Sequence, residues 1–309
     1  MAAQEQGGII TYSFVHISDT QNLATRYPDT YNLTFSSLES MKKPFNVSAI
    51  IITGDLVNGW DRTNEWEAYV RARNLTTIPV YDTAGNHDTS GGNEYRFYMA
   101  YTGMPRENYV TSIGDLDLVG INYAGRTYPE EEFLRLRTLL DGSLRSNAII
   151  ATHYYMNEDG APSLLGDDID RYLIRKPALI LTGHMHGDFI TDKTISGIPV
   201  MAEMTNYQDG IPGGSSGQNY AAGTLYTMTS GNGHVERITA RVIHLYPVQP
   251  PEPEVIVFAR DTYQGPGGPV SGLPAGTLTA PSCSFGSLPS MLDGFIRTCR
   301  AGLSRIFTN

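Results

Sequence analysis

Five short apolar runs in this 309-residue chain each lead into polar side chains that can bind a metal ion. Three of the polar clusters begin with glycine: Gly54-Asp55, Gly85-Asn86-His87-Asp88 and Gly183-His184-Met185-His186. The other two are Asp19-Thr20-Gln21 and a single His153. The runs span 12–17, 49–53, 80–84, 148–152 and 178–182, and their length and apolar content predict buried strands. Polar groups at the carboxyl ends of such strands converge on one rim of a sheet.

The segments between the first three runs have helical periodicity. Thr30–Lys43 and Asp61–Arg73 each place apolar residues on one side of a predicted helix. Together with the runs they form a βαβαβ unit, which favours a parallel sheet with right-handed connections. Asp55 and Asn86 are about thirty residues apart, the usual length of one βαβ unit, so they are expected to be neighbours in space.

The later part of the chain is expected to be richer in strands. We predict helices at 93–101 and 129–140, a hairpin formed by 108–113 and 116–121, and a second sheet containing 198–203, 222–229 and 234–245. Gly231-Asn232-Gly233 is the expected turn between the last two strands. The Gly- and Ser-rich segment 207–223 is expected to form a loop near the metal site.

The ordered set GD, GNHD, H and GHxH resembles the calcineurin-like metallophosphoesterase family, and the resemblance covers Thr11 to Leu245. The family implies an α/β fold: a four-layer α/β/β/α sandwich of two mixed sheets flanked by helices. Its metal site lies at the carboxyl-end rim of the strands. Two divalent metal ions there are bridged by one aspartate and a water-derived hydroxide, which attacks the phosphorus of a phosphoester.

The resemblance also assigns roles to residues. Asp19, Gln21 and His186 would hold one ion, Asn86, His153 and His184 the other, and Asp55 would bridge both. His87 would be the general acid, with Asp88 either orienting its ring or capping the following helix. The metals stay open among Mn, Zn, Fe, Co, Ni and Mg. The family usually has His at the position of Gln21, and an amide oxygen there would shift that site toward Mn²⁺ or Mg²⁺, or lower its occupancy.

The formal net charge of −10 argues against duplex nucleic acid as a partner, because such binding needs clustered Lys and Arg. Two divalent ions facing two carboxylates would nevertheless leave a local surplus of roughly two positive charges, enough to attract a small phosphoester. No apolar run reaches the roughly 18 residues of a membrane span, and the amino end has no signal peptide pattern. The chain as given is expected to be soluble, with export after removal of a leader kept as an alternative.

We divide the chain into an N-terminal extension (1–10), a catalytic domain (11–245) and a Pro- and Gly-rich linker with a tail (246–309). Residues 288–307 have one apolar face and three arginines, a pattern of a basic amphipathic helix. Packing of this helix on its own domain, or a frayed chain end, is favoured over contact with a membrane or a partner. The two cysteines, Cys283 and Cys299, both lie in the tail, and the sequence does not fix the oligomeric state.

The preferred function is hydrolysis of a small phosphomonoester or phosphodiester by a metallophosphoesterase. The alternative is a non-catalytic metal-binding scaffold of the same fold that acts in protein interaction, motivated by Gln21 and the tail. Among the remaining histidines, His16 is expected in the core or behind the ligands, and His234 and His244 have no assigned role. Four tyrosines are expected to line the cleft and stack on an aromatic substrate group: Tyr154, Tyr155, Tyr207 and Tyr220.

Overall fold

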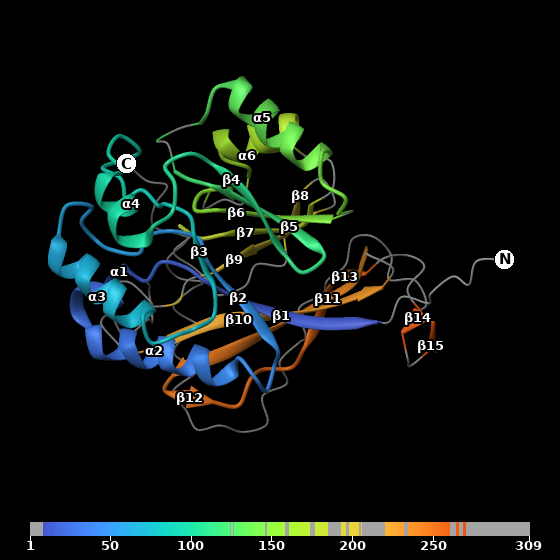
Figure 1. The fold of residues 1–309 in the computed structure, drawn as a ribbon, viewed down its shortest axis with the longest axis horizontal. Helices are drawn as coiled ribbons and strands as arrows, with labels where there is room; N and C mark the ends of the chain where they lie inside the picture. The colour runs from blue at the N-terminus through green and yellow to red at the C-terminus, as the bar shows by residue number, and fades with distance from the viewer. Residues whose placement is uncertain are drawn as a thin grey trace, which may run out of the picture.

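The computed structural model describes residues 9–123, 125, 127–145, 147–157, 161–173, 177–184, 193–195, 198–203, 205, 220–231, 234–259, 264–265 and 268–269. These residues form a mixed α/β fold with two mixed sheets and flanking helices (Figure 1). Among them, no helix has the length and apolar character needed to cross a membrane. His186, Tyr207 and the predicted helix 288–307 lie outside the described residues.

The first sheet contains the βαβαβ unit that the sequence predicts. In spatial order its strands are β12 (Val248–Gln249), β11 (His234–Tyr246), β10 (Ala221–Gly231), β1 (Ile10–Ile17), β2 (Val47–Ile52) and β3 (Val80–Asp82), with β13 (Val255–Ala259) paired to β11. Strands β1, β2 and β3 are parallel, while β10 and β11 are antiparallel to their neighbours. The carboxyl ends of β1, β2 and β3 therefore meet at one edge of the sheet.

The second sheet is also mixed. Its strands, in spatial order, are β4 (Tyr109–Ile113), β5 (Leu116–Ile121), β6 (Asn147–Thr152), β7 (Pro177–Thr182), β9 (Ile198–Ala202) and β8 (Lys193–Ile195). β4 and β5 form the predicted hairpin, and β5, β6, β7 and β9 are parallel. A separate short pair consists of β14 (Gln264–Gly265) and β15 (Gly268–Pro269).

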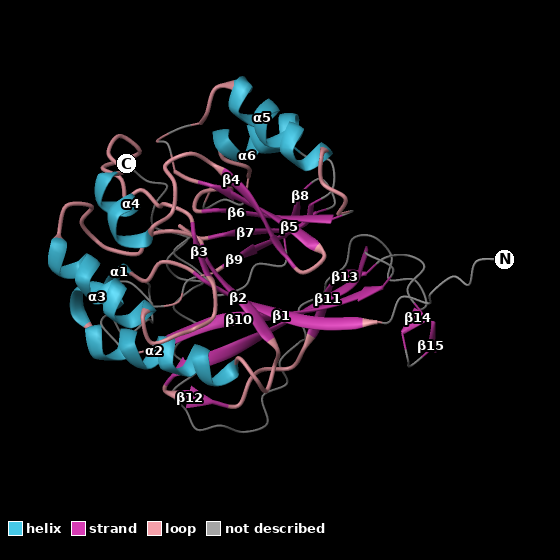
Figure 2. Ribbon diagram, in the orientation of Figure 1, coloured by secondary structure: helices cyan, strands magenta, loops and turns pink. Residues whose placement is uncertain are grey.

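The helices flank the two sheets (Figure 2). They are α1 (Gln21–Arg26), α2 (Pro28–Met41), α3 (Thr63–Arg73), α4 (Arg96–Thr102), α5 (Glu130–Asp141) and α6 (Leu164–Asp168), the last followed by a π-helical turn (Ile169–Leu173). The predicted helices 30–43, 61–73, 93–101 and 129–140 correspond to α2, α3, α4 and α5. Pro28 begins α2 because a missing N–H costs nothing in the first turn.

Three buried apolar clusters hold the elements together. In the first, Tyr31 and Phe35 of α2 and Trp66 of α3 pack on β1 and β2. The second lies between the two sheets, where Phe14 of β1 stacks on Tyr226 of β10 with ring centroids 4.8 Å apart. The third joins β5, β6, β7 and β9 to α5, α6 and the π-helical turn. The first cluster thus lies between helices and the first sheet, the second between the two sheets, and the third between the second sheet and helices. We interpret this order as the predicted four-layer sandwich.

The structure corrects the predicted membership of the sheets. Of the three segments assigned to the second sheet, only β9 belongs to it, through pairing with β7. β10 and β11 instead extend the first sheet, because β10 lies antiparallel beside β1 along seven paired residues. β12 and β13 also pair with β11, so the first sheet continues beyond residue 245 into the segment predicted as a linker. The division into a catalytic domain and a tail remains a prediction.

Candidate metal centre

Five of the predicted ligands follow the carboxyl ends of five strands. Asp19 comes after β1, Asp55 after β2 and Asn86 after β3, whereas His153 and His184 come after β6 and β7. The first three therefore belong to one sheet and the two histidines to the other. The sequence predicted that the ligands lie at the rim of one sheet, and the structure corrects this. The rim is shared by two sheets, whose strand ends point to the same side of the molecule (Figure 1).

The centre of the cluster is the imidazole of His153. Its Nδ1 donates a hydrogen bond to the carbonyl of Thr53, 2.7 Å away, which leaves Nε2 directed at the other side chains. Nε2 lies 3.0 Å from Oδ1 of Asn86, 3.1 Å from Nδ1 of His184 and 3.3 Å from Oδ1 of Asp55. Ligand atoms of Asp55, His153 and His184 all lie within 4.8 Å of one another.

Asp19 and Gln21 contact this cluster from the β1 side. Oδ2 of Asp19 accepts hydrogen bonds from the hydroxyl of Ser18 and the backbone N–H of His184. The side-chain amide of Gln21 donates to Oδ2 of Asp55 at 3.2 Å. Oδ1 of Asp19 and Oε1 of Gln21 are buried and have no hydrogen-bond partner among the residues that the structure describes. Buried oxygens without a donor are costly, so both atoms have the chemistry expected of ligands to a cation.

The residues present therefore fit a divalent metal site. Nε2 of His153 has at most one hydrogen, which can bond well to only one of the three atoms around it. A cation can bind several oxygen and nitrogen atoms at the same time. Carboxylate, amide oxygen and imidazole nitrogen are ordinary ligands for the metals considered above. A site with this composition can bind metal, and with it the oxygens of an anionic ligand.

The buried charges perturb one another. Burial alone would raise the pKa of Asp55, but the charge and hydrogen bond of His153, with a smaller effect of His87, outweigh it and lower the pKa. Burial opposes a charge on His153, yet Asp55 and Asp19 raise its pKa to about 9. Burial, reinforced by Asp55 and opposed by His153, raises the pKa of Asp19 to about 6. Such mutual perturbation of buried groups is typical of functional sites.

Steric crowding explains why glycines precede the ligands. A Cβ on Gly85 would lie 2.1 Å from Oδ1 of Asp55, and a Cβ on Gly183 would lie 2.4 Å from Oδ2 of Asp19. Both contacts are far inside van der Waals range, so only glycine lets the ligand loops approach this closely. Asp19, Asp55 and His184 themselves have positive φ angles of 54°, 52° and 67°. Left-handed backbone at non-glycine residues is strained and is concentrated at functional sites.

His87 lies at the open side of the cluster. Its backbone N–H donates to Oδ1 of Asp55 at 3.0 Å, and its side chain is 39% exposed. The ring Nδ1 donates to the carbonyl of Asn58 at 2.9 Å, and Nε2 lies 3.9 Å from Oδ2 of Asp55. The ring is thus oriented by Asn58, with Nε2 on the side of Asp55.

Asp88 holds the ligand loops and makes its contacts with the backbone. Its Oδ1 accepts from the N–H groups of Leu56 and Val57, and its Oδ2 accepts from the N–H of Gly85. These bonds tie the loop after β2 to the loop after β3. Burial first, then the charge of Asp55, raises the pKa of Asp88 to about 7. These contacts differ from both roles considered for Asp88. The ring of His87 is held by the carbonyl of Asn58, and the N–H groups that Asp88 binds belong to loops and not to the first turn of a helix.

Sequence reasoning missed Glu203 and Thr205. Glu203 follows β9 at the same rim, is buried, and accepts a hydrogen bond from the hydroxyl of Thr224 at 2.6 Å. Burial raises its pKa well above the usual value. Thr205 exchanges two hydrogen bonds with Ser18, which precedes Asp19. Glu203 carries the signal used for the ligands, a polar residue at the end of an apolar run.

His16 has the interior position expected of it. It is fully buried, and its Nε2 lies 2.8 Å from the hydroxyl of Thr53. Burial lowers its pKa to about 3, so the imidazole is neutral. His16 therefore lies beside the residue whose carbonyl orients His153.

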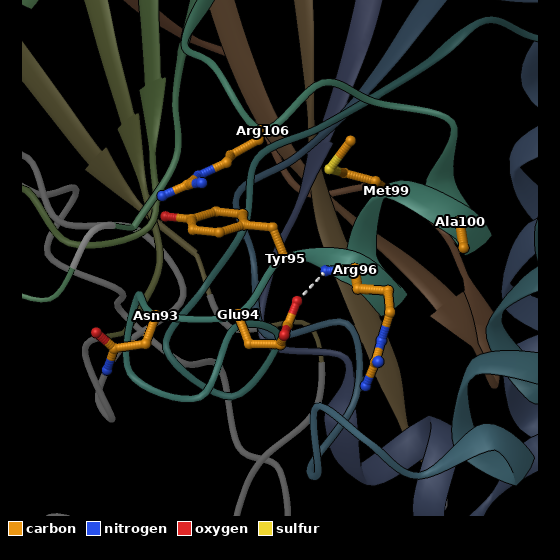
Figure 3. A pocket seen from close by; sticks show the side chains of 7 residues that line it. All are labelled: Asn93, Glu94, Tyr95, Arg96, Met99, Ala100 and Arg106. Atoms are coloured by element: carbon orange, nitrogen blue, oxygen red, sulfur yellow. Dashed lines mark hydrogen bonds between the residues drawn. The ribbon is translucent and has the colours of Figure 1, made fainter.

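A surface pocket of about 610 Å³ lies beside α4, and residues of the 93–106 segment line it, among them Tyr95, Arg96 and Arg106 (Figure 3). The guanidinium of Arg106 lies 5.4 Å from the centroid of the Tyr95 ring. None of the predicted metal ligands that the structure describes lines this pocket. Tyr95, which lines it, donates a hydrogen bond from its hydroxyl to the carbonyl of Tyr123.

The calcineurin-like phosphoesterase family model matches residues 12–188, more than half of the chain. The chain belongs to the calcineurin-like phosphoesterase family. The match includes every predicted ligand and His87, and it confirms the resemblance and the predicted enzyme class, a metallophosphoesterase. Calcineurin-like phosphoesterases typically bind two metals, and the His153 cluster is a candidate for part of that centre.

Three proteins similar to this calcineurin-like chain have 12% to 26% sequence identity with it. Uncharacterized protein YvnB of Bacillus subtilis (strain 168) is 26% identical over 197 residues, covering 57% of the chain but only 15% of YvnB. Purple acid phosphatase PPD1 from yellow lupin (Lupinus luteus) has a TM-score of 0.58 at 12% identity, covering 82% of the chain and 55% of PPD1. GAP50 of Plasmodium, described as the anchor in the inner membrane complex, has a TM-score of 0.55 at 12% identity, with 81% and 89% covered. The structural likenesses support the fold.

Proposed function

We propose that this chain hydrolyses small phosphomonoesters or phosphodiesters with two divalent metal ions. The observation that carries the proposal is the arrangement around Nε2 of His153, where Asn86, His184 and Asp55 converge within 3.3 Å. Membership of the family supports the same activity. The net charge of −10 is compatible with an anionic substrate because the metal ions would reverse the charge locally.

Asp55 is the proposed shared ligand, since its two carboxylate oxygens face different groups. Oδ1 faces His153, on the side of Asn86 and His184, whereas Oδ2 faces Gln21, on the side of Asp19. By resemblance to the family, His186 would join Asp19 and Gln21 in holding the second ion. When bound, two divalent ions would lower the pKa of an attacking water and neutralise charge on the phosphoryl oxygens.

His87 is the proposed proton donor to the oxygen of the leaving group. The Asn58 carbonyl holds the Nδ1 proton, so the proton that can be transferred is the one on Nε2. Asp88 supports this step indirectly, since it fixes the loop that carries Asn86 and His87. A carbonyl partner keeps the ring oriented without binding the proton that moves.

The test is hydrolysis of p-nitrophenyl phosphate and bis(p-nitrophenyl) phosphate with Mn²⁺, Zn²⁺, Fe²⁺, Co²⁺, Ni²⁺ or Mg²⁺. We expect activity with at least one ion, loss of it in Asp55→Asn, and retention in Asp61→Asn, which changes an exposed acid in the same way. His87→Asn should lower kcat for an alkyl phosphoester roughly 100-fold or more, and much less for the p-nitrophenyl ester, whose leaving group needs little protonation.

Two results would count against the proposal. If no ion supported hydrolysis of any substrate class, the proposed phosphoesterase activity would be wrong. Binding of one ion or none by the purified protein, together with capture of a protein partner, would favour the non-catalytic scaffold. The exposed and oriented ring of His87 favours catalysis over the scaffold, because a scaffold has no use for it.

A further inference from the structure

The open side of the metal centre is bordered by two tyrosine rings. Tyr154 lies with its ring centroid 4.5 Å from that of His184, and the Tyr123 ring lies 6.4 Å from that of His153. The two tyrosine rings are 6.5 Å apart and inclined by 49°. Asp19, Asp55 and His153 are buried, while Tyr123, Tyr154 and His184 are half-buried. The tyrosines therefore lie between the buried ligands and the solvent.

The Tyr154 ring and the Tyr123 backbone are held in place from outside the cluster. The hydroxyl of Tyr154 donates to Oδ1 of Asn157 at 2.5 Å, and its carbonyl accepts from the hydroxyl of Ser163. The backbone N–H of Tyr123 donates to the carbonyl of Ala84, and its carbonyl accepts from the hydroxyl of Tyr95. Figure 3 shows Tyr95 beside Arg106 on the wall of the neighbouring pocket. A fixed aromatic ring such as that of Tyr154 loses little entropy when it binds a planar group.

The structure revises which tyrosines can have this role. Tyr155 is fully buried against α6 and the π-helical turn, and its hydroxyl donates to Asp170. Tyr220, whose hydroxyl is hydrogen-bonded with His244 of β11, stays a prediction for this role, and Tyr207 lies outside the described residues. Tyr154 keeps the role expected from the sequence, and Tyr123, which the sequence did not single out, joins it.

We propose that Tyr123 and Tyr154 form an aromatic wall that binds a planar aromatic group of the substrate by stacking, so that aryl or nucleobase phosphoesters are preferred over alkyl ones. The inference rests on the proposed function, because the wall acts on a ligand whose phosphoryl group is held at the metal centre. Stacking between a planar ring and an aromatic side chain tolerates different ring identities.

The test compares phenylphosphonate with cyclohexylphosphonate as ligands of the metal-loaded protein, by titration calorimetry and as inhibitors of its activity. The two have rings of similar size, but only one is planar and aromatic, and neither has a leaving group that could hide a binding effect. We expect the inhibition constant of phenylphosphonate to be about tenfold lower, as alanine substitutions of stacking aromatics indicate. Tyr123→Ala should abolish this difference and Tyr123→Phe should keep it.

Tyr172→Ala is the matched control, because Tyr172 is a half-buried tyrosine that stacks on Phe133 and not on the metal ligands. It should leave the ratio of the two inhibition constants unchanged. Tyr123→Ala should fold, because the two hydrogen bonds of this residue given above are made by its backbone. Circular dichroism and thermal unfolding would verify that.

Equal inhibition by the two phosphonates, in an enzyme that hydrolyses phosphoesters, would overturn the aromatic wall and leave the proposed function intact. A loss of the ratio in Tyr123→Phe as large as in Tyr123→Ala would also overturn it, since the hydroxyl and not the ring would then be responsible. If the protein hydrolysed no phosphoester and bound neither phosphonate, the proposed function itself would fail.

Discussion

The imidazole Nε2 of His153 lies 3.3 Å from Oδ1 of Asp55, although the two residues follow strands of different sheets. The contact joins the loop after β6 to the loop after β2, and the carbonyl of Thr53 holds the histidine from the other side. The metal centre therefore depends on the correct packing of the two sheets as well as on the ligands.

Gly85→Ala should impair metal binding without changing a ligand. The added Cβ would lie 2.1 Å from Oδ1 of Asp55, so the carboxylate or the backbone must move. We expect the metal affinity, measured by titration calorimetry, to fall by roughly tenfold or more, as happens when the support of a ligand is lost. Gly142→Ala is the control, since its Cβ would have only ordinary contacts at 3.6 Å. Equal affinities in the two variants would contradict this steric explanation.

Asp88→Asn should destabilise the ligand loops. The carboxylate accepts three backbone N–H bonds with its two oxygens, whereas an amide must turn its NH₂ toward one of the donors. The expected loss in the free energy of unfolding is about 1–3 kcal/mol, measured by urea denaturation of the metal-free protein. The exposed Asp61→Asn should change it by less than about 0.5 kcal/mol. If Asp88→Asn had the same free energy of unfolding as wild type, these hydrogen bonds would contribute little to stability.

Asp82 should contribute to a pH dependence of stability. Burial is the main cause that raises its pKa to about 6, while Arg73 and the hydroxyl of Tyr69, 2.7 Å away, oppose the rise. A raised carboxyl pKa means that the folded state binds a proton more tightly than the unfolded state. The contribution to stability is therefore full below about pH 4 and is lost as pH rises toward 6.

Asp82→Asn removes this titration. Between pH 4 and pH 7, its free energy of unfolding should fall less than that of wild type, with a difference of up to ~3 kcal/mol. Urea denaturation at the two pH values provides the comparison. Parallel pH profiles of the two proteins would show that Asp82 is not protonated in the folded state.

Gln21→His should change metal selectivity. Imidazole is a softer ligand than an amide oxygen, so the variant should bind Zn²⁺ more tightly relative to Mn²⁺ than wild type does. Competition between the two ions, followed by metal analysis of the protein, measures the ratio. Gln21 already contacts Asp55, so the new ring would lie beside the proposed shared ligand. An identical ratio and metal content in both proteins would contradict a ligand role at position 21.

The sequence was informative where the chemistry is local. Strand ends with Gly-led polar clusters located the loops of Asp55, Asn86 and His184, because those glycines are required by close backbone approach. It was misleading for β10 and β11, because an apolar run indicates a buried strand but not which strand lies beside it. Pairing with β1 follows from packing such as Phe14 on Tyr226, which no local pattern contains.

The sequence also could not predict roles that depend on the direction in which a side chain points. Asp88 stands next to His87 in the chain, yet its carboxylate is turned inward to the backbone of Leu56 and Val57. Tyr154 and Tyr155 are neighbours, yet one borders the metal centre and the other is buried beside Asp170. Tyr123 borders the site only because the tertiary fold brings the end of β5 beside His153.

The most direct test of a two-metal centre shared by Asp55 is a crystal of the protein grown with Mn²⁺ and examined by anomalous scattering. We predict two peaks about 3.5–4 Å apart, with the Asp55 carboxylate bound to both. One peak should also contact Asn86, His153 and His184, and the other Asp19 and Gln21. A single peak, or two peaks without Asp55 between them, would contradict the assignment.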